Sequence, residues 1–302
     1  MTPKQLKTIA LALAVLLVLW GASEVFLNRS DRTRGERLFP AISQAQTDSI
    51  VIERKADTVH LVKHLDYWAV NGRRAHPNEV DAFFTQLGDS TPPEIAARSS
   101  AVHARMGVDS TNTRRVRVYS GGQAVIHVLV GERGPDYQSS YVRRPEEETV
   151  YLRYGPFAGF VDRAPDDWRE TRMANIVPDS IARVDVTRHG RRYSVVRRDS
   201  TWQFADGRPA DTDAVTRLLQ KFHPANATGF ATPEDERAVN FARPDLRVVV
   251  RNGRGDTLTH LLGDSMPNGY WVRHDSGGSI FRNGVWIADE IAPHDSTLRR
   301  RN

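Results

Sequence analysis

Hydrophobic residues form one unbroken run near the start of the chain and short alternating stretches after it. Residues 6–27 read LKTIALALAVLLVLWGASEVFL. At 1.5 Å per residue such a helix spans about 33 Å, which matches a hydrocarbon core of about 30 Å. We therefore expect residues 1–28 to be an uncleaved transmembrane signal-anchor helix. A cleaved signal peptide is the competing interpretation, but the usual Ala-x-Ala exit is missing and Val25-Phe26-Leu27 prolongs the run.

The orientation of this helix is predicted from its short leader. Lys4 and Lys7 flank one end and several arginines, beginning with Arg29, flank the other, so the positive-inside count does not decide. A short tail before the anchor is typical of a signal-anchor, and long domains after it translocate largely regardless of their charge. We expect the rest of the chain to be extracytoplasmic, beginning with a polar tether at residues 29–47.

After the tether the pattern of the chain repeats. Asp48-Ser49-Ile50 recurs as Asp179-Ser180-Ile181, and Trp68 recurs as Trp202. The repeat is too long for a solenoid unit. We therefore expect two copies of one domain, residues 48–178 and residues 179–302, the second ending in a short basic tail.

Each copy is expected to combine antiparallel strands with one helix. Alternating apolar positions predict strands in the first copy at 50–52, 59–62, 67–70, 116–119, 124–130, 141–143 and 150–152. In the second copy they predict strands at 246–250, 257–262, 270–273 and 279–281. A helix is predicted at Pro77 to Leu87, where Val80, Phe83, Phe84 and Leu87 follow helical spacing, and its counterpart is Thr212 to Phe222. The predicted fold class is α+β: an N-terminal transmembrane helix followed by two duplicated antiparallel strand-rich α+β repeats.

Composition narrows the function classes. The net charge is +5, but the arginines are interspersed with Asp and Glu, which is typical of a solvated surface rather than of a nucleic-acid binder. Cysteine is absent, which excludes disulfides, thiolate catalysis and cysteine metal sites.

The sharpest candidate for chemistry is Ser265 in the stretch LTHLLGDSMPNG, because Gly-Asp-Ser-Met resembles the nucleophile motif of Gly-Asp-Ser-Leu esterases and lipases. In the first copy, however, Arg133 occupies the serine position. Both copies have a glycine followed four residues later by a proline, at Gly131–Pro135 and Gly263–Pro267, and this pair predicts a turn between strands. Few residues follow Ser265, and Asp289 and His294 have the wrong spacing for that family. We therefore predict no catalytic residues, with no histidine in hydrogen-bonding distance of the Ser265 hydroxyl.

Other polar groups favour structural interpretations. His60 and His64 have a metal spacing for helices but lie in a predicted strand without a third ligand. Acidic residues cluster in polar loops at Glu146-Glu147-Glu148, Asp166-Asp167 and Asp235-Glu236, where solvation explains them. GxGxxG and GxxxxGK are absent. We expect no metal site and no cofactor.

The chain resembles the bacterial family known as domain of unknown function 4340. The resemblance rests on an N-terminal anchor, Leu38-Phe39-Pro40, the Asp-Ser-Ile start with Trp68, and a turn followed by Tyr141-Val142-Arg143 or Trp271-Val272-Arg273, and covers nearly all of residues 6–290. Arg105-Met106-Gly107-Val108-Asp109 departs from it, because the family tends to have Tyr-Gly-Leu-Asp-Pro there. The family has no catalytic residues to carry over, and some members look like partners of gliding-type ABC export systems.

This resemblance implies a non-catalytic accessory or scaffold protein of a transport or cell-envelope complex. It would sit in the bacterial inner membrane by a single pass, with membrane-protein partners, an ABC-type exporter among them, and no nucleic acid. The alternative is a binding module for an envelope glycan or polymer that uses strand-borne Trp and Arg. The third hypothesis is a Ser265-dependent esterase.

Overall fold

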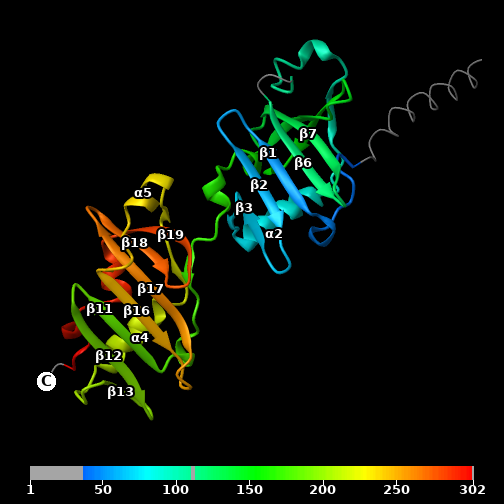
Figure 1. Ribbon diagram of the computed structural model, residues 1–302. Helices are drawn as coiled ribbons and strands as arrows, with labels where there is room; N and C mark the ends of the chain where they lie inside the picture. Colours follow the sequence, from blue (N-terminus) through cyan, green and yellow to red (C-terminus); the bar gives the residue numbers. More distant parts are fainter. Residues whose placement is uncertain (1–36, 110–112, 301–302) are drawn as a thin grey trace, which may run out of the picture. The chain divides into compact units, whose positions relative to one another are not determined.

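The computed structural model of the chain describes residues 37–109 and 113–300 (Figure 1). The expected anchor at 1–28 and the first part of the expected tether lie outside these residues. Within the described part, no helix has both the length and the apolar character needed to cross a membrane.

The described chain is strand-rich α+β, and its strand pairs are antiparallel. It divides into two compact units, unit 1 ending at Trp168 and unit 2 beginning at Arg169. This division precedes Asp179, where the sequence repeat restarts. The reason is that residues 169–178 pack on unit 2: β10 (Arg172–Ala174) pairs with β14 (Ala225–Asn226), and the Ile176 amide donates to the Phe222 carbonyl at 2.8 Å.

Unit 1 is built on one nine-stranded sheet of order β4-β3-β2-β1-β6-β7-β8-β9-β5. The strands are β1 (Ser49–Glu53), β2 (Thr58–Lys63), β3 (Trp68–Val70), β4 (Arg73–Arg74), β5 (Glu94–Ala97), β6 (Arg114–Ser120), β7 (Gln123–Arg133), β8 (Ser139–Arg143) and β9 (Val150–Tyr154). All seven strands predicted for this copy are present. β4 and β5 were not predicted, because β4 is a two-residue edge and β5 lacks apolar alternation.

One face of this sheet is covered by helices. Helix α2 (Pro77–Leu87) has the predicted bounds, with Pro77 in its first turn and the four spaced apolar residues buried. The short helix α3 (Phe157–Val161), which was not predicted, adds Phe157, and the Phe83 ring stacks on it with centroids 5.9 Å apart. Both helices belong to one apolar core with the inward residues of β1, β2, β6 and β7.

Unit 2 is built on an eight-stranded sheet of order β13-β12-β11-β16-β17-β18-β19-β15. The strands are β11 (Arg183–Arg188), β12 (Arg191–Arg198), β13 (Thr201–Phe204), β15 (Gly229–Phe230), β16 (Leu246–Arg251), β17 (Thr257–Met266), β18 (Gly269–His274) and β19 (Gly277–Gly284). Helices α4 (Thr212–Gln220) and α6 (Trp286–Ile291) pack on one face, and α5 (Pro233–Ala238) lies in the connection before β16. The helix predicted at Thr212 is present and ends two residues early, at Gln220.

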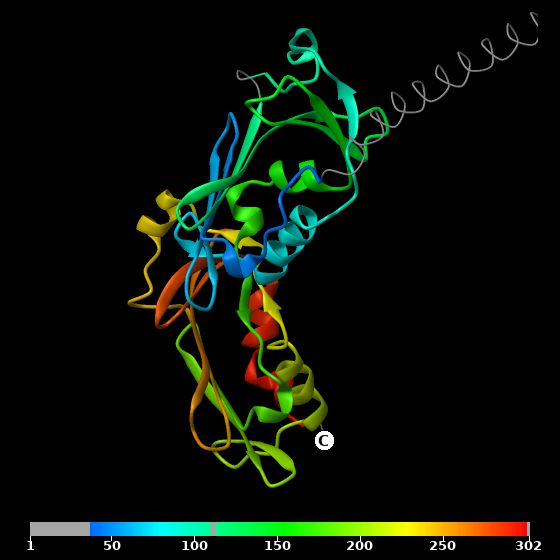
Figure 2. The same ribbon diagram turned by 90° about the vertical axis from the view of Figure 1, so that its right-hand side faces the viewer.

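The two sheets follow the same order of strands. In each sheet the first strand of the unit, β1 or β11, lies in the interior of the sheet. The next two strands of the chain, β2 and β3 or β12 and β13, follow on one side of it, and a long hairpin, β6–β7 or β16–β17, follows on the other side. Trp68 on β3 and Trp202 on β13 occupy the same place and are each 7% exposed, as predicted. In unit 2, α4 and α6 lie together on one side of the sheet, as Figure 2 shows.

Candidate functional site

Ser265 lies within β17 and not in a turn, so the predicted turn at Gly263–Pro267 is wrong in extent. Gly263, Asp264 and Ser265 pair in register with β18, and the reversal falls on Pro267-Asn268. The sequence misled because Gly-Asp-Ser is poor in apolar residues, whereas the pairing that extends the strand comes from β18. The first copy behaves alike, since β7 runs to Arg133.

The Ser265 hydroxyl donates its hydrogen bond to a carboxylate. Its partner is Asp245 Oδ2, which also accepts from the Ser265 backbone amide at 3.1 Å. The Ser265 hydroxyl is the main cause that lowers the pKa of Asp245. Asp245 in turn lies 4.0 Å from Nδ1 of His189, whose Nε2 is 3.0 Å from the Tyr270 hydroxyl.

The order of these groups matters for chemistry. A serine nucleophile needs a base that takes its proton, commonly a histidine that is itself oriented by a third group. Here the carboxylate stands between the serine and the histidine. The chain of contacts therefore ties the β11–β12 turn, where His189 lies, to the β17–β18 hairpin.

The other polar groups singled out in the sequence make local structural contacts. The His64 ring stacks on Tyr67 with centroids 4.6 Å apart. Glu147 pairs with Arg144 at 2.8 Å, and Asp235 caps the first turn of α5. Among the described residues, no three His, Asp or Glu side chains are grouped so as to hold a metal ion.

Sequence reasoning missed a row of side chains that both units carry on the face opposite the helices. In unit 1 the row is Arg115, Leu129 and Arg143, which are paired directly across β6, β7 and β8. In unit 2 it is Arg247, Leu262 and Arg273, paired across β16, β17 and β18. Both leucines are buried, at 2% and 3% exposed, although neither belongs to the helix-side core.

A histidine lies beside each row at the same strand position. His127 Nδ1 is 3.7 Å from Glu146, and His260 Nδ1 is 3.1 Å from Asp275. Burial is the main cause that lowers the pKa of both histidines, and it favours the neutral ring. Each Nε2 atom is buried without a hydrogen-bond partner. Both Nε2 atoms are thus enclosed by the packing of this face.

The arginines of the rows hold the loop that precedes β6 or β16. The Arg143 guanidinium donates from Nε to the Val108 carbonyl at 3.0 Å, and the Arg273 guanidinium lies 4.4 Å from the centre of the Phe241 ring. The sequence contains one sign of the shared rows, because His127 and His260 occupy the same position when the sequences of the two copies are aligned.

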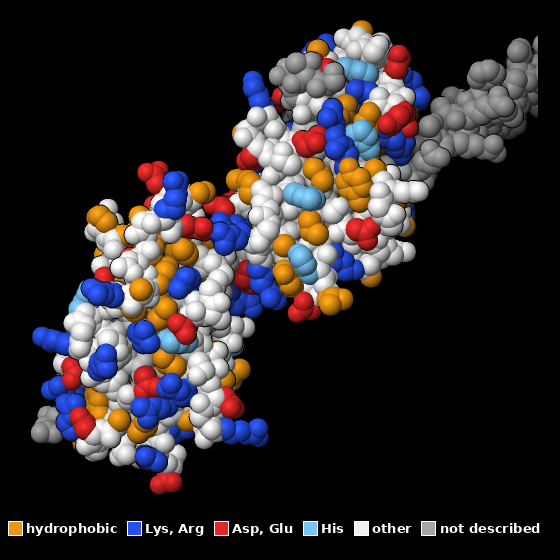
Figure 3. Space-filling view, viewed as in Figure 1, with side chains coloured by type: hydrophobic (Ala, Val, Ile, Leu, Met, Phe, Trp, Pro, Cys, Tyr) orange, Lys and Arg blue, Asp and Glu red, His pale blue; other side chains and the backbone are white. Residues whose placement is uncertain are grey.

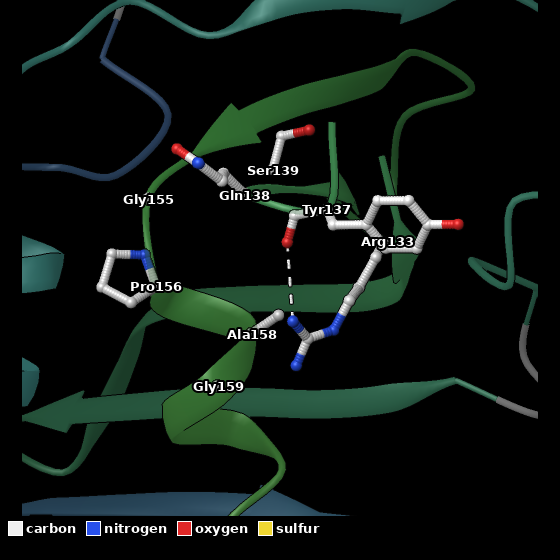
Figure 4. Close-up of a pocket in the computed structure, with 8 residues that line it drawn as sticks. All are labelled: Arg133, Tyr137, Gln138, Ser139, Gly155, Pro156, Ala158 and Gly159. Atoms are coloured by element: carbon white, nitrogen blue, oxygen red, sulfur yellow. Dashed lines mark hydrogen bonds between the residues drawn. The ribbon is translucent and has the colours of Figure 1, made fainter. Parts of the chain in front are cut away.

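Unit 1 has a pocket at the far end of the β7–β8 hairpin, beside the start of α3. Its volume is about 360 Å³, within the range of small-molecule sites, and Figure 4 shows its lining. The lining residues are Arg133, Tyr137, Gln138, Ser139, Gly155, Pro156, Ala158 and Gly159.

Tyr137 is the outstanding side chain of this pocket. It is 77% exposed and has a φ of +59°, a backbone conformation that a tyrosine rarely adopts. Asp136 fixes the turn by accepting from the amides of Gln138 and Ser139 at 3.1 and 2.9 Å, and Arg133 donates to the Tyr137 carbonyl at 3.5 Å. An exposed aromatic ring on a fixed, strained turn is a feature that binding sites use.

This pocket depends on a longer turn in unit 1. Residues 134–138 join β7 to β8, whereas only Pro267 and Asn268 join β17 to β18. The extra residues bring in Tyr137. By contrast, the strand-borne Trp68 and Trp202 lie in the cores and cannot form a stacking platform.

Comparison with known proteins places the chain in a family without assigning an activity. No curated protein and no solved structure matches it. The family model described as Domain of unknown function (DUF4340) matches residues 68–244, which is more than half of the chain and includes parts of both units. The chain therefore belongs to the DUF4340 family.

Proposed function

We propose that this protein is a non-catalytic accessory or scaffold component of a bacterial transport or cell-envelope complex, anchored in the inner membrane by residues 1–28 with both units outside the cytoplasm. An ABC-type exporter is one candidate partner. We also infer that the two units arose by duplication of one α+β domain.

The observation that carries this proposal is the doubled architecture. Two sheets share one strand order, and each carries helices on one side and the same Arg-Leu-Arg row on the other. Two similar units on one chain offer two related binding surfaces at one place, and linked sites raise avidity without new contacts. The contact of Ser265 with Asp245 supports the non-catalytic part, because the hydroxyl is engaged by a carboxylate instead of a histidine base.

The test is affinity purification of the full chain from membranes in mild detergent. We expect a membrane protein to co-purify in a fixed ratio, and the chain to stay in the membrane fraction after an alkaline carbonate wash. Release by the wash, together with an N-terminus near Ser23, would show that the anchor is cleaved.

A second candidate is binding of an envelope glycan, and the pocket beside Tyr137 favours it. A flat exposed ring can stack on the apolar face of a sugar, and the Arg133 and Gln138 side chains supply donors for hydroxyl or carboxylate oxygens. Binding to purified peptidoglycan sacculi is expected to weaken in Tyr137→Ala. Tyr154→Ala, which removes another exposed tyrosine that does not line this pocket, is the matched control.

A further inference from the structure

Unit 2 contains a second pocket of about 370 Å³, and it is strongly basic. It lies between the β11–β12 turn and the chain after α6. It is lined by Arg188, Arg191, Arg192, Tyr193, Pro293, His294, Asp295 and Arg299. Four guanidinium groups therefore surround a space whose lining holds one carboxylate. Figure 3 shows Lys and Arg side chains gathered over the part of unit 2 where β11 and β12 lie.

Two of these arginines face each other across the sheet. Arg188 on β11 is the direct register partner of Arg191 on β12, and Arg192 follows it. Like charges placed directly opposite each other destabilise a sheet. Arg191 and Arg192 are exposed, and in the described part of the chain neither side chain has an ion pair or hydrogen bond.

Unit 1 shows how the same position is neutralised. Ile52 and Val186 are equivalent, because each lies opposite a buried valine of the next strand, Val116 or Val248. Counting from them along each hairpin makes Arg54 the counterpart of Arg188 and Asp57 the counterpart of Arg191. Arg54 and Asp57 form an ion pair of 2.5 Å. Unit 2 thus has an arginine where unit 1 has the balancing carboxylate, and its Arg188 pairs with Asp289 of α6 instead.

The rest of the pocket is held in place. Arg188 donates to Asp289 Oδ1 at 2.6 Å and to the Ala292 carbonyl at 3.2 Å. Arg299 donates to Asp295, and its backbone bridges to Ala210. The partly buried Tyr193 hydroxyl donates to the Pro293 carbonyl at 2.5 Å. This part of the site is therefore organised before any ligand binds, which lowers the cost of binding.

We propose that this pocket binds a phosphate group carried by a small molecule or by a lipid headgroup. The planar guanidinium fork matches phosphate oxygens with paired charge-assisted hydrogen bonds. A carboxylate ligand is a poorer match, because it has two oxygens and one charge and a single arginine is enough to pair with it. Several arginines around one space fit a tetrahedral group with more oxygens and up to two charges, and such a group relieves the repulsion between Arg188 and Arg191.

The test is calorimetric titration of the full chain in a non-ionic detergent with two soluble probes, glycerol 3-phosphate and dihexanoyl phosphatidylglycerol. Saturable binding of at least one probe is expected. The double variant Arg191→Ala/Arg192→Ala and the single variant Arg191→Asp, which sets a carboxylate opposite Arg188, should each bind about tenfold more weakly or worse. The control is Arg198→Ala/Arg254→Ala, which removes the same charge from exposed positions outside the pocket and should bind as the unmodified chain does.

Each outcome decides the proposal. Preference for glycerol 3-phosphate favours a phosphorylated small molecule, and preference for dihexanoyl phosphatidylglycerol favours a diester lipid headgroup. Absence of saturable binding of both probes, or equal weakening in the control, would overturn the phosphate site and leave only general charge attraction. Circular dichroism of every variant separates loss of binding from loss of fold. Because the site lies in unit 2 and needs no partner protein, its failure would not affect the proposed accessory role.

Discussion

Replacement of Gly131 by alanine is expected to destabilise unit 1, because β7 and the loop before β6 approach each other closely at this residue. A Cβ atom at Gly131 would lie 2.1 Å from the Met106 carbonyl oxygen and 2.6 Å from Cγ1 of Val108. The loop cannot yield cheaply, because the Glu132 amide donates to that same Met106 oxygen at 2.9 Å.

The size of the effect follows from these contacts. Overpacking of a filled interior costs about 1–3 kcal/mol, and an obstacle formed by backbone puts this case at the upper end. Weakening the hydrogen bond of Glu132 adds about 0.5–1.5 kcal/mol. A total loss of about 4 kcal/mol would lower the melting temperature of a domain of this size by roughly 8–16 °C.

The matched control is Gly159→Ala in helix α3. Nothing lies within 4 Å of its added Cβ, so the change should stabilise unit 1 by about 0.4–1 kcal/mol. Differential scanning calorimetry of the full chain in detergent measures both variants. If Gly131→Ala changes the free energy of unfolding by less than about 0.5 kcal/mol, the close packing of this loop on β7 is refuted.

Four further predictions concern unit 2. Trp202→Ala should lower the free energy of unfolding by about 3–5 kcal/mol in a urea titration, because the ring lies in the core, and a loss below about 1 kcal/mol would contradict that burial. Ser265→Ala should raise the pKa of Asp245 towards its usual range in a carboxyl NMR titration. A carboxyl group whose pKa is lowered by folding stabilises the protein above the pKa of the unfolded state, and this stabilisation is lost as the pH falls through the pKa of the folded state. The variant should therefore lose stability at neutral pH but not in strong acid. Fluorophosphonate is expected not to label Ser265, and stoichiometric labelling would make the protein an esterase. Burial holds the pKa of His260 below 6.5, so below that pH the unfolded state binds more protons than the folded state and the free energy of unfolding decreases. His260→Gln should make this decrease with falling pH smaller. An unchanged dependence of stability on pH would contradict the burial of the ring.

The pattern of apolar residues predicted correctly those elements that are determined by their own sequence. Helix α2 has its predicted bounds because Pro77 and four apolar residues at helical spacing all lie inside it. The ends of strands were harder, since Gly263 to Ser265 are strand only because β18 pairs with them. Gly263 itself is needed for space rather than for a turn, since an added Cβ would lie 2.9 Å from the Leu246 Cβ.

The sites depended on contacts that no local pattern encodes. Leu129 and Leu262 are buried on the face without helices, and the sequence pattern did not predict this burial. Tyr137 is visible in the sequence as an insertion, but its exposure comes from the fixed turn. The opposition of Arg188 and Arg191 appears only once the register of the β11–β12 hairpin is known.

The central claim is that this protein works by holding other components of a membrane complex. Site-specific photo-crosslinking in living cells tests it most directly, with the photoreactive residue placed at the exposed positions Leu65, Tyr137 and Trp286 in turn. We predict light-dependent adducts of defined mass from at least one position, with a membrane protein as the second member. Full-length chain in the membrane fraction that gives no adduct from any of the three positions would contradict the accessory role.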